Sequence, residues 1–118
     1  MEWSNGRVKG FLTSVIRGGF RRWPPKFEVL KEARQGKEIN TKTGRMAEHY
    51  RCSSCSTSFP AKEVQVDHIE PVVDPIIGFV DWNTFIERLF CDKENLQVLC
   101  KKCHKEKTKL EVIKRKKK

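Results

Sequence analysis

Two pairs of closely spaced cysteines enclose the residues of this chain that are best suited to chemistry. Cys52 and Cys55 form one Cys-x-x-Cys pair, and Cys100 and Cys103 form another, which His104 follows directly. Two such pairs can present four thiolates to one tetrahedral zinc ion, and a site filled by four protein ligands has no open position for a substrate. The spacing therefore predicts a structural zinc site. Reduced or redox-active cysteines without metal are the alternative.

An Asp-His step, Asp67-His68, lies between the two cysteine pairs. The preceding residues 64–66 alternate as a strand, so the two side chains point to opposite faces unless the strand ends at this step. Together with His104, the step supplies one carboxylate and two imidazoles. These groups can hold a divalent metal ion and take a proton from water. The set is typical of a metal-dependent phosphodiester hydrolase.

The spacing of apolar and turn-forming residues predicts the elements that must position these groups. Helices are expected at residues 7–17, 24–34, 82–90 and from 101 onward, with Asp81 as the cap of the third. A second strand is expected at residues 96–99, and the chain is β-like from about residue 47. Residues 37–46 are mostly polar and are expected to form a linker.

The positive charge of the chain is concentrated at its two ends. The net charge is +10 over 118 residues. Residues 101–118 hold ten Lys and Arg against two acidic residues, and residues 1–27 hold six against one. The segment 28–100 holds nine basic and twelve acidic residues. Basic ends around an acidic middle favour a polyanionic partner and a metal ion in the middle, although a solvated surface with a disordered tail has the same composition.

The complete pattern of cysteines, Asp-His step and Asn-Leu-Gln segment resembles the HNH endonuclease family. The segments that carry the resemblance are VDHIEPV and NLQVLCKKCHKEKT, within about residues 50–109. The resemblance implies an α+β fold with a ββα-metal (HNH) finger stapled by the four-cysteine zinc. A basic, mainly helical arm and linker (1–46) would precede a nuclease domain with a basic C-terminal helix (47–118).

The resemblance also implies a role for each residue of the motif. His68 would be the general base, and Asp67 and His104 would bind the catalytic metal, Mg²⁺ or Mn²⁺. Asn95 would pin the loop that orients the base, with Asn83 as a competing choice. His104 could instead belong to the zinc site. The expected reaction is hydrolysis of DNA to 5′-phosphate and 3′-hydroxyl ends.

Basic side chains near the motif are the expected DNA contacts. They are Arg21, Arg22, Lys26, Lys101, Lys102, Lys105, Lys107 and Lys109. Trp23 could stack on DNA or anchor the arm to the core. DNA is the expected partner. A second copy of the chain or a larger phage DNA-processing machine is a further expected partner. A non-catalytic zinc-containing nucleic-acid-binding module is the alternative function.

Composition favours a small globular protein inside the cell. Hydrophobic residues make up 37% and charged residues 34%, and no apolar run is long enough to span a membrane. The first residues lack the basic-then-apolar pattern of a secretory signal. Cysteines with metal-ligand spacing, reduced and not joined in disulfides, also favour a reducing compartment. The cytoplasm of a bacterium or of an infected host is therefore expected.

Overall fold

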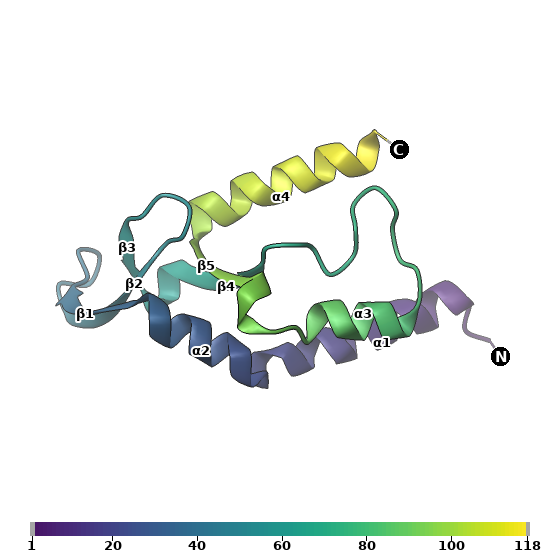
Figure 1. Cartoon of the computed structure of the whole chain (residues 1–118), viewed down its shortest axis with the longest axis horizontal. Helices are drawn as coiled ribbons and strands as arrows, with labels where there is room; N and C mark the ends of the chain where they lie inside the picture. Colours follow the sequence, from purple (N-terminus) through teal and green to yellow (C-terminus); the bar gives the residue numbers. More distant parts are fainter. Residues whose placement is uncertain (1, 118) are drawn as a thin grey trace.

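The computed structural model describes residues 2–117, which form a mixed α+β fold (Figure 1). The α-helices are α1 (Asn5–Gly19), α2 (Pro24–Ala33), α3 (Trp82–Leu89) and α4 (Lys101–Lys116). The strands are β1 (Arg34–Ile39), β2 (Met46–Arg51), β3 (Ser58–Pro60), β4 (Val64–His68) and β5 (Leu96–Cys100). Short 3₁₀ helices cover Phe20–Arg22, Ala61–Glu63 and Lys93–Asn95. The α-helices and the strands β4 and β5 follow the sequence prediction closely.

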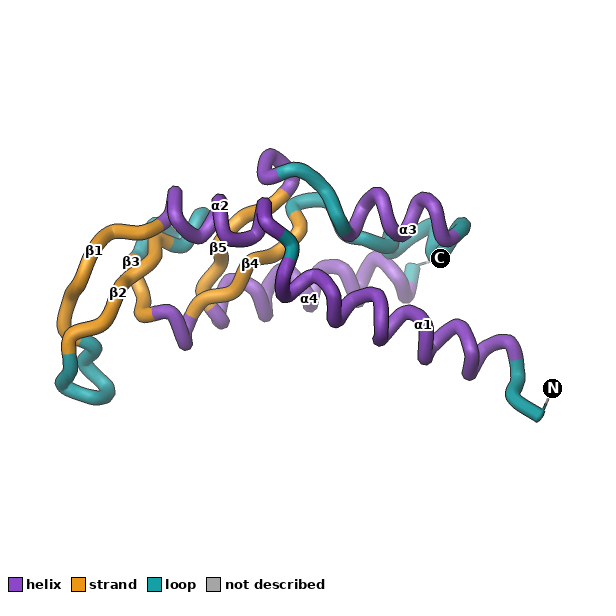
Figure 2. The backbone as a smooth tube through the Cα atoms, turned by 90° about the horizontal axis from the view of Figure 1, so that it is seen from below, coloured by secondary structure: helices purple, strands orange, loops and turns teal. Residues whose placement is uncertain are grey.

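The strands form two antiparallel sheets, which lie next to each other in Figure 2. One sheet has the order β1-β2-β3, and the other consists of β4 and β5. The connection between β4 and β5 is long and contains α3, but the pair is called the β4–β5 hairpin because its strands are antiparallel neighbours. In the hairpin, Val64 pairs with Cys100 and Asp67 pairs with Gln97. Helix α4 begins where β5 ends and runs back beside the hairpin (Figure 1). Seven residues of helix rise about 10.5 Å and three residues of strand about 10 Å, so residue 107 reaches Asp67.

The prediction of a linker at residues 37–46 was wrong. Strands β1 and β2 form a hairpin there, in which Lys37 pairs with Glu48 and Ile39 with Met46. Gly36 has a φ of +110° at an irregularity in the pairing, and Gly44 has a φ of +73° in the turn. Five of the six β1 residues are exposed, so this edge strand lacks the apolar alternation by which a half-buried strand is recognised.

The N-terminal helices pack against the rest of the chain through an aromatic anchor. Helix α1 ends at Gly19, and the two prolines after Trp23 open α2. The Trp23 indole Nε1 donates a 2.7 Å hydrogen bond to the Cys91 carbonyl, and its ring packs against Phe90 at 5.3 Å between centroids. The structure thus gives Trp23 the anchoring role of the two that the sequence allowed.

The core consists of small clusters that join the two ends of the chain. Asp81 caps helix α3, because its carboxylate accepts the Thr84 amide at 2.7 Å, and the helix buries Phe85 and Leu89. Val29 of α2 packs against buried residues of β5 in a second cluster. The N-terminal helices therefore share hydrophobic clusters with β5 and with α3. Within residues 2–117, no helix combines the length and the apolar character that a membrane crossing requires.

Candidate metal centre and active site

The four cysteines of the two pairs come together, as their spacing predicts. Cys52 and Cys55 lie in the turn between β2 and β3, Cys100 ends β5, and Cys103 lies in the first turn of α4. Their sulfur atoms all lie within 4.8 Å of one another. In a tetrahedral zinc site, with Zn–S bonds of about 2.3 Å, the sulfurs are about 3.8 Å apart. The cluster needs only a small contraction, and the four cysteines could hold a metal ion such as zinc.

Local backbone geometry forms the two cysteine turns. The Cys52 amide donates to the Thr57 carbonyl at 2.9 Å, and the Ser56 amide donates to the Cys52 carbonyl at 2.9 Å. Ser56 takes a left-handed φ of 62° to close this turn. On the other side, the Cys100 sulfur caps α4 by accepting the Cys103 amide at 3.5 Å. A sulfur at a helix N-terminus is well placed to carry negative charge.

The thiols of the cluster differ strongly in acidity. Burial opposes ionisation of Cys52, but backbone hydrogen bonds of Cys55, Cys100 and Ser54 outweigh it and lower the pKa of Cys52 to about 6. The pKa of Cys103 is raised to about 12, first by its hydrogen bond to Cys100 and then by burial. The Cys52 thiolate therefore already forms at neutral pH, and thiolate is the form that binds metal.

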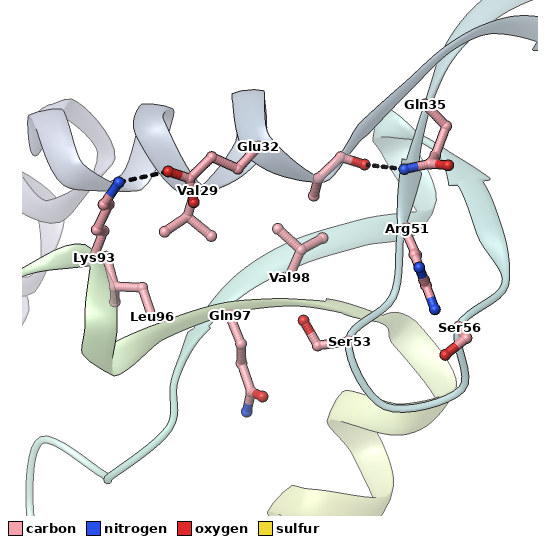
Figure 3. Close-up of a pocket in the computed structure, with 11 residues that line it drawn as sticks. Val29, Glu32, Gln35, Arg51, Ser53, Ser56, Lys93, Leu96, Gln97 and Val98 are labelled. Atoms are coloured by element: carbon pink, nitrogen blue, oxygen red, sulfur yellow. Dashed lines mark hydrogen bonds and ion pairs between the residues drawn. The ribbon is translucent and has the colours of Figure 1, made fainter.

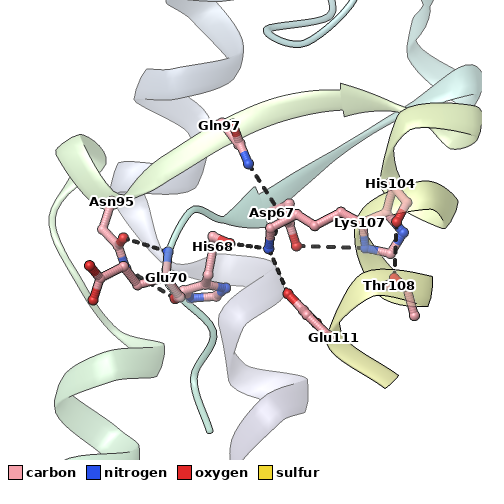
Figure 4. A network of polar contacts seen from close by, with 9 residues as sticks. All are labelled: Asp67, His68, Glu70, Asn95, Gln97, His104, Lys107, Thr108 and Glu111. Atoms are coloured by element: carbon pink, nitrogen blue, oxygen red, sulfur yellow. Dashed lines mark hydrogen bonds and ion pairs between the residues drawn. The ribbon is translucent and has the colours of Figure 1, made fainter. Parts of the chain in front are cut away.

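Asp67 and His104 face each other between β4 and α4 (Figure 4). Asp67 Oδ1 lies 3.6 Å from His104 Nε2. The side chain of Gln97, the cross-strand partner of Asp67, approaches its other oxygen at 3.5 Å. His104 is held here because Cys103 before it belongs to the cysteine cluster. The structure thus places His104 beside Asp67 rather than within the cluster of four sulfurs.

His68 points away from Asp67, toward the N-terminal and middle helices. Its Nε2 lies 2.8 Å from the Leu89 carbonyl at the end of α3, and its ring packs against Phe20 at 4.8 Å between centroids. A carbonyl oxygen can only accept, so Nε2 carries the proton and Nδ1 of the neutral ring has the free lone pair. Burial lowers the pKa of His68 and outweighs the Leu89 hydrogen bond and the Asp67 charge, which raise it; the positive charges of Arg17 and Lys107 add smaller lowering effects. His68 is therefore neutral at pH 7 and able to accept a proton.

Asn95 holds the chain that follows His68. Its side-chain Oδ1 accepts the Glu70 amide at 2.9 Å, and its backbone carbonyl accepts the Ile69 amide at 2.8 Å. The competing residue, Asn83, is exposed on α3. Of the two asparagines, Asn95 is the one in contact with the loop beside the Asp-His step.

Lys107 differs from the other lysines expected to contact DNA. Its ammonium donates to Asp67 Oδ2 at 2.7 Å, to the His68 carbonyl at 2.7 Å and to Glu111 Oε1 at 2.9 Å. An ammonium has three N–H donors, and all three find partners here. Burial alone would lower the pKa of Lys107, but the hydrogen bonds with Asp67 and Glu111 raise it overall. Lys107 is thus a fixed positive charge inside the site.

One cavity joins these groups. Its volume is about 320 Å³, and Asp67, His68, His104, Lys107 and Glu111 all line it. The loop after His68 forms another part of its wall. Lys107 was predicted to contact DNA, and Glu111 was not predicted to belong to the site. Their spacing of three and seven residues after His104, on one face of α4, is the signal that could have found both.

Two arginines from the ends of the chain also line this cavity, Arg17 of α1 and Arg115 of α4. The Arg17 guanidinium lies 5.5 Å from the centre of the Phe85 ring. Among residues 2–117, no carboxylate lies within ion-pair distance of Arg17. Arg17 lies outside the motif, and its place at the cavity depends on how α1 packs on α3.

A second pocket, of about 450 Å³, lies between α2 and β5 (Figure 3). It is lined by Val29, Glu32 and Lys93, with Arg51 and serines of the first cysteine turn on its other side. Lys93 is paired with Glu32 at 2.6 Å. The pocket has neither a histidine nor a cysteine in its lining, so its residues are less suited to hydrolysis than those of the smaller cavity.

The remaining basic residues expected to contact DNA lie on three elements. Arg21 and Arg22 are exposed in the turn after α1, and Lys26 is half-buried on α2. Four lysines of α4 have exposed side chains: Lys101, Lys102, Lys105 and Lys109. The exposed basic residues expected to contact DNA thus lie on α4 and in the short 3₁₀ helix after α1.

Comparisons of the chain with protein-family models, with curated proteins and with solved structures find no match.

Proposed function

We propose that this protein is a metal-dependent DNA endonuclease of the HNH type. The observation that carries the proposal is the arrangement of Asp67, His104 and a neutral His68 around one cavity. The order of β4, β5 and α4 and the four-cysteine cluster agree with a ββα-metal finger. Helix α3 lies between β4 and β5 in the sequence and would be an insertion relative to a compact ββα-metal finger.

Asp67 and His104 fit a divalent metal ion. Two adjacent ligands of an octahedral Mg²⁺ or Mn²⁺ ion, each about 2.1 Å from it, lie about 3.0 Å apart. Asp67 Oδ1 and His104 Nε2 are 3.6 Å apart, so a small movement brings both within reach of one ion. With only two protein ligands, such an ion keeps positions for phosphate and water, and it would stabilise negative charge on the phosphate oxygens.

His68 would act as the general base. The Leu89 carbonyl fixes the proton on Nε2, which leaves Nδ1 to take a proton from the attacking water. Its lowered pKa keeps it unprotonated at neutral pH, as a base must be. Asn95 would position this residue through the backbone of Ile69 and Glu70.

DNA is the proposed substrate because two basic helices, α1 and α4, contribute residues to the lining of the cavity. The chain has a net charge of +10, and its positive charge lies mostly on α4 and around α1. Phosphate contacts of this kind give binding without reading sequence. We therefore propose phosphodiester hydrolysis in DNA that leaves 5′-phosphate and 3′-hydroxyl ends.

Incubation of the zinc-loaded protein with supercoiled plasmid in Mg²⁺, in Mn²⁺ and in EDTA tests this function. We expect cleavage in at least one metal ion, none in EDTA, and loss of the metal-dependent activity in Asp67→Asn. Relaxed circles would indicate nicking, and linear product would indicate paired cuts. If a folded, zinc-containing protein cuts in no metal, the endonuclease is excluded and the zinc-containing nucleic-acid-binding module becomes the better explanation of the cysteines and the basic helices.

Replacement of Arg17 with glutamine is expected to lower kcat/KM for cleavage by about 10–150-fold. Arg17 lines the cavity, has no acidic partner among residues 2–117 and could donate to a phosphate oxygen. A hydrogen bond to a charged group is worth about 1.5–3 kcal/mol. Arg45→Gln is the matched control, because Arg45 is exposed in the β1–β2 turn. Equal small losses in both variants would show that Arg17 adds only general charge.

Replacement of Asn95 with alanine is expected to lower the cleavage rate by about 10–100-fold, because misplacement of a catalytic group by about 1 Å can cost this much. The matched control is Asn83→Ala, since Asn83 is exposed on α3. Rates at saturating metal and thermal unfolding are measured for both. A rate loss in Asn83→Ala, with none in Asn95→Ala, would reverse the assignment.

A further inference from the structure

We propose that Lys107 makes divalent-metal binding at Asp67 and His104 depend on a phosphodiester group in the same cavity. The inference rests on the proposed function, because it concerns the same metal site. It assigns to Lys107 a regulatory role in place of a surface contact with DNA. Lys107 is a positioning residue in this proposal, since it acts through Asp67.

Oxygen atoms surround the Lys107 ammonium. Its three neighbours are all oxygens, from Asp67, Glu111 and the backbone of His68, at 2.7–2.9 Å. A hard divalent cation would choose the same kinds of oxygen ligand. The side chain is only 25% exposed, and Glu111 lies one helical turn from Lys107 and holds it in place. The protein therefore brings its own cation to the carboxylate that the metal needs.

Positively and negatively charged side chains line the cavity in equal number. Three cationic side chains line it, Arg17, Lys107 and Arg115, and three carboxylates line it, Asp67, Asp74 and Glu111. The charges of these six side chains cancel. A divalent ion that enters alone adds two positive charges next to Lys107, at a site where Asp67 is already neutralised. Repulsion between like charges is strong in such a partly buried site, so the ion alone binds weakly.

A phosphodiester group bound in the cavity changes this balance of charge. Each phosphodiester group carries one negative charge, which offsets part of the charge of the metal ion and gives the cationic lining a partner. Metal and DNA therefore bind with positive coupling, and the coupling is reciprocal: each ligand raises the affinity for the other by the same factor. The advantage for a nuclease is that its metal centre fills more readily when a phosphodiester backbone is bound.

The test measures Mn²⁺ binding by the electron paramagnetic resonance signal of the free ion. It uses the full chain with zinc in the cysteine site and His68→Ala, so that a short DNA duplex is bound without being cut. The double variant Asp67→Asn with His68→Ala supplies the background from DNA and other groups. Zinc content and thermal unfolding of every variant confirm that it is folded.

In the His68→Ala protein, we expect the duplex to tighten Mn²⁺ binding by about tenfold or more, within the usual range of coupling between sites. Adding Lys107→Met should tighten Mn²⁺ binding without DNA by about tenfold and reduce the effect of DNA to less than about threefold. Lys107→Gln should behave in the same way, and Lys107→Arg should retain the coupling. These results would support the proposal, since a purely structural role of Lys107 would not tighten metal binding.

Two outcomes overturn the proposal, and they differ in what they say about the enzyme. Mn²⁺ binding that depends on Asp67 but is unchanged or weaker without Lys107 removes the role of Lys107 and leaves the nuclease intact. No binding that depends on Asp67, with or without DNA, removes the metal site itself and the proposed function with it.

Discussion

Replacement of His68 with alanine is expected to slow plasmid cleavage by about 100–10,000-fold, the usual contribution of a general base. The reason is local. Leu89 holds the proton on Nε2, burial lowers the pKa of the ring, and both keep Nδ1 free to accept the proton of water. Initial rates at saturating Mg²⁺ or Mn²⁺ measure the effect.

Two controls separate catalysis from folding in this variant. The His68→Ala protein should keep its zinc content and its affinity for DNA, because His68 lies outside the cysteine cluster and has no expected phosphate contact. His68→Gln retains a polar side chain of similar length and should be nearly as slow, since an amide cannot serve as the base. If either variant cleaves at the rate of the native chain, His68 is not the base.

Removal of zinc is expected to abolish the cooperative thermal unfolding transition. Structural zinc in small modules binds with an apparent free energy of about 10–16 kcal/mol, while whole domains are stable by only about 5–15 kcal/mol. Cys100→Ser should therefore lose bound zinc and most of its folded structure, as measured by elemental analysis and by circular dichroism on heating. Activity should fall as well, because the adjoining turn of α4 positions His104.

The matched control for zinc loss is Cys91→Ser, the same substitution at the cysteine outside the cluster. Cys91 is half-buried, and burial raises the pKa of its thiol, so it remains an uncharged thiol at neutral pH. This variant should keep one zinc ion per chain and a cooperative transition. A Cys100→Ser protein that also kept both would show that the four sulfurs do not hold a structural metal.

Local patterns were enough to predict most of the elements. The apolar face of α3, its cap at Asp81 and the alternation before Asp67 each depend on near neighbours in the chain, so the sequence could place them. The cysteine cluster was also predictable, because the spacing of its ligands is a chemical requirement of tetrahedral metal binding. The β1 strand was missed because its side chains are mostly exposed on both faces and give no periodic signal.

The sequence by itself determined which groups are available for chemistry: the four sulfurs, Asp67, His68 and His104. Only the tertiary structure decided how they are used. The Leu89 carbonyl selects the tautomer of His68, Arg17 reaches the cavity from the other end of the chain, and Lys107 turns inward to Asp67. These contacts join residues that are distant in the sequence, and they depend on how the helices pack around the hairpin. Residue types and spacing carry the chemistry of a site, whereas its protonation and charge balance arise from packing.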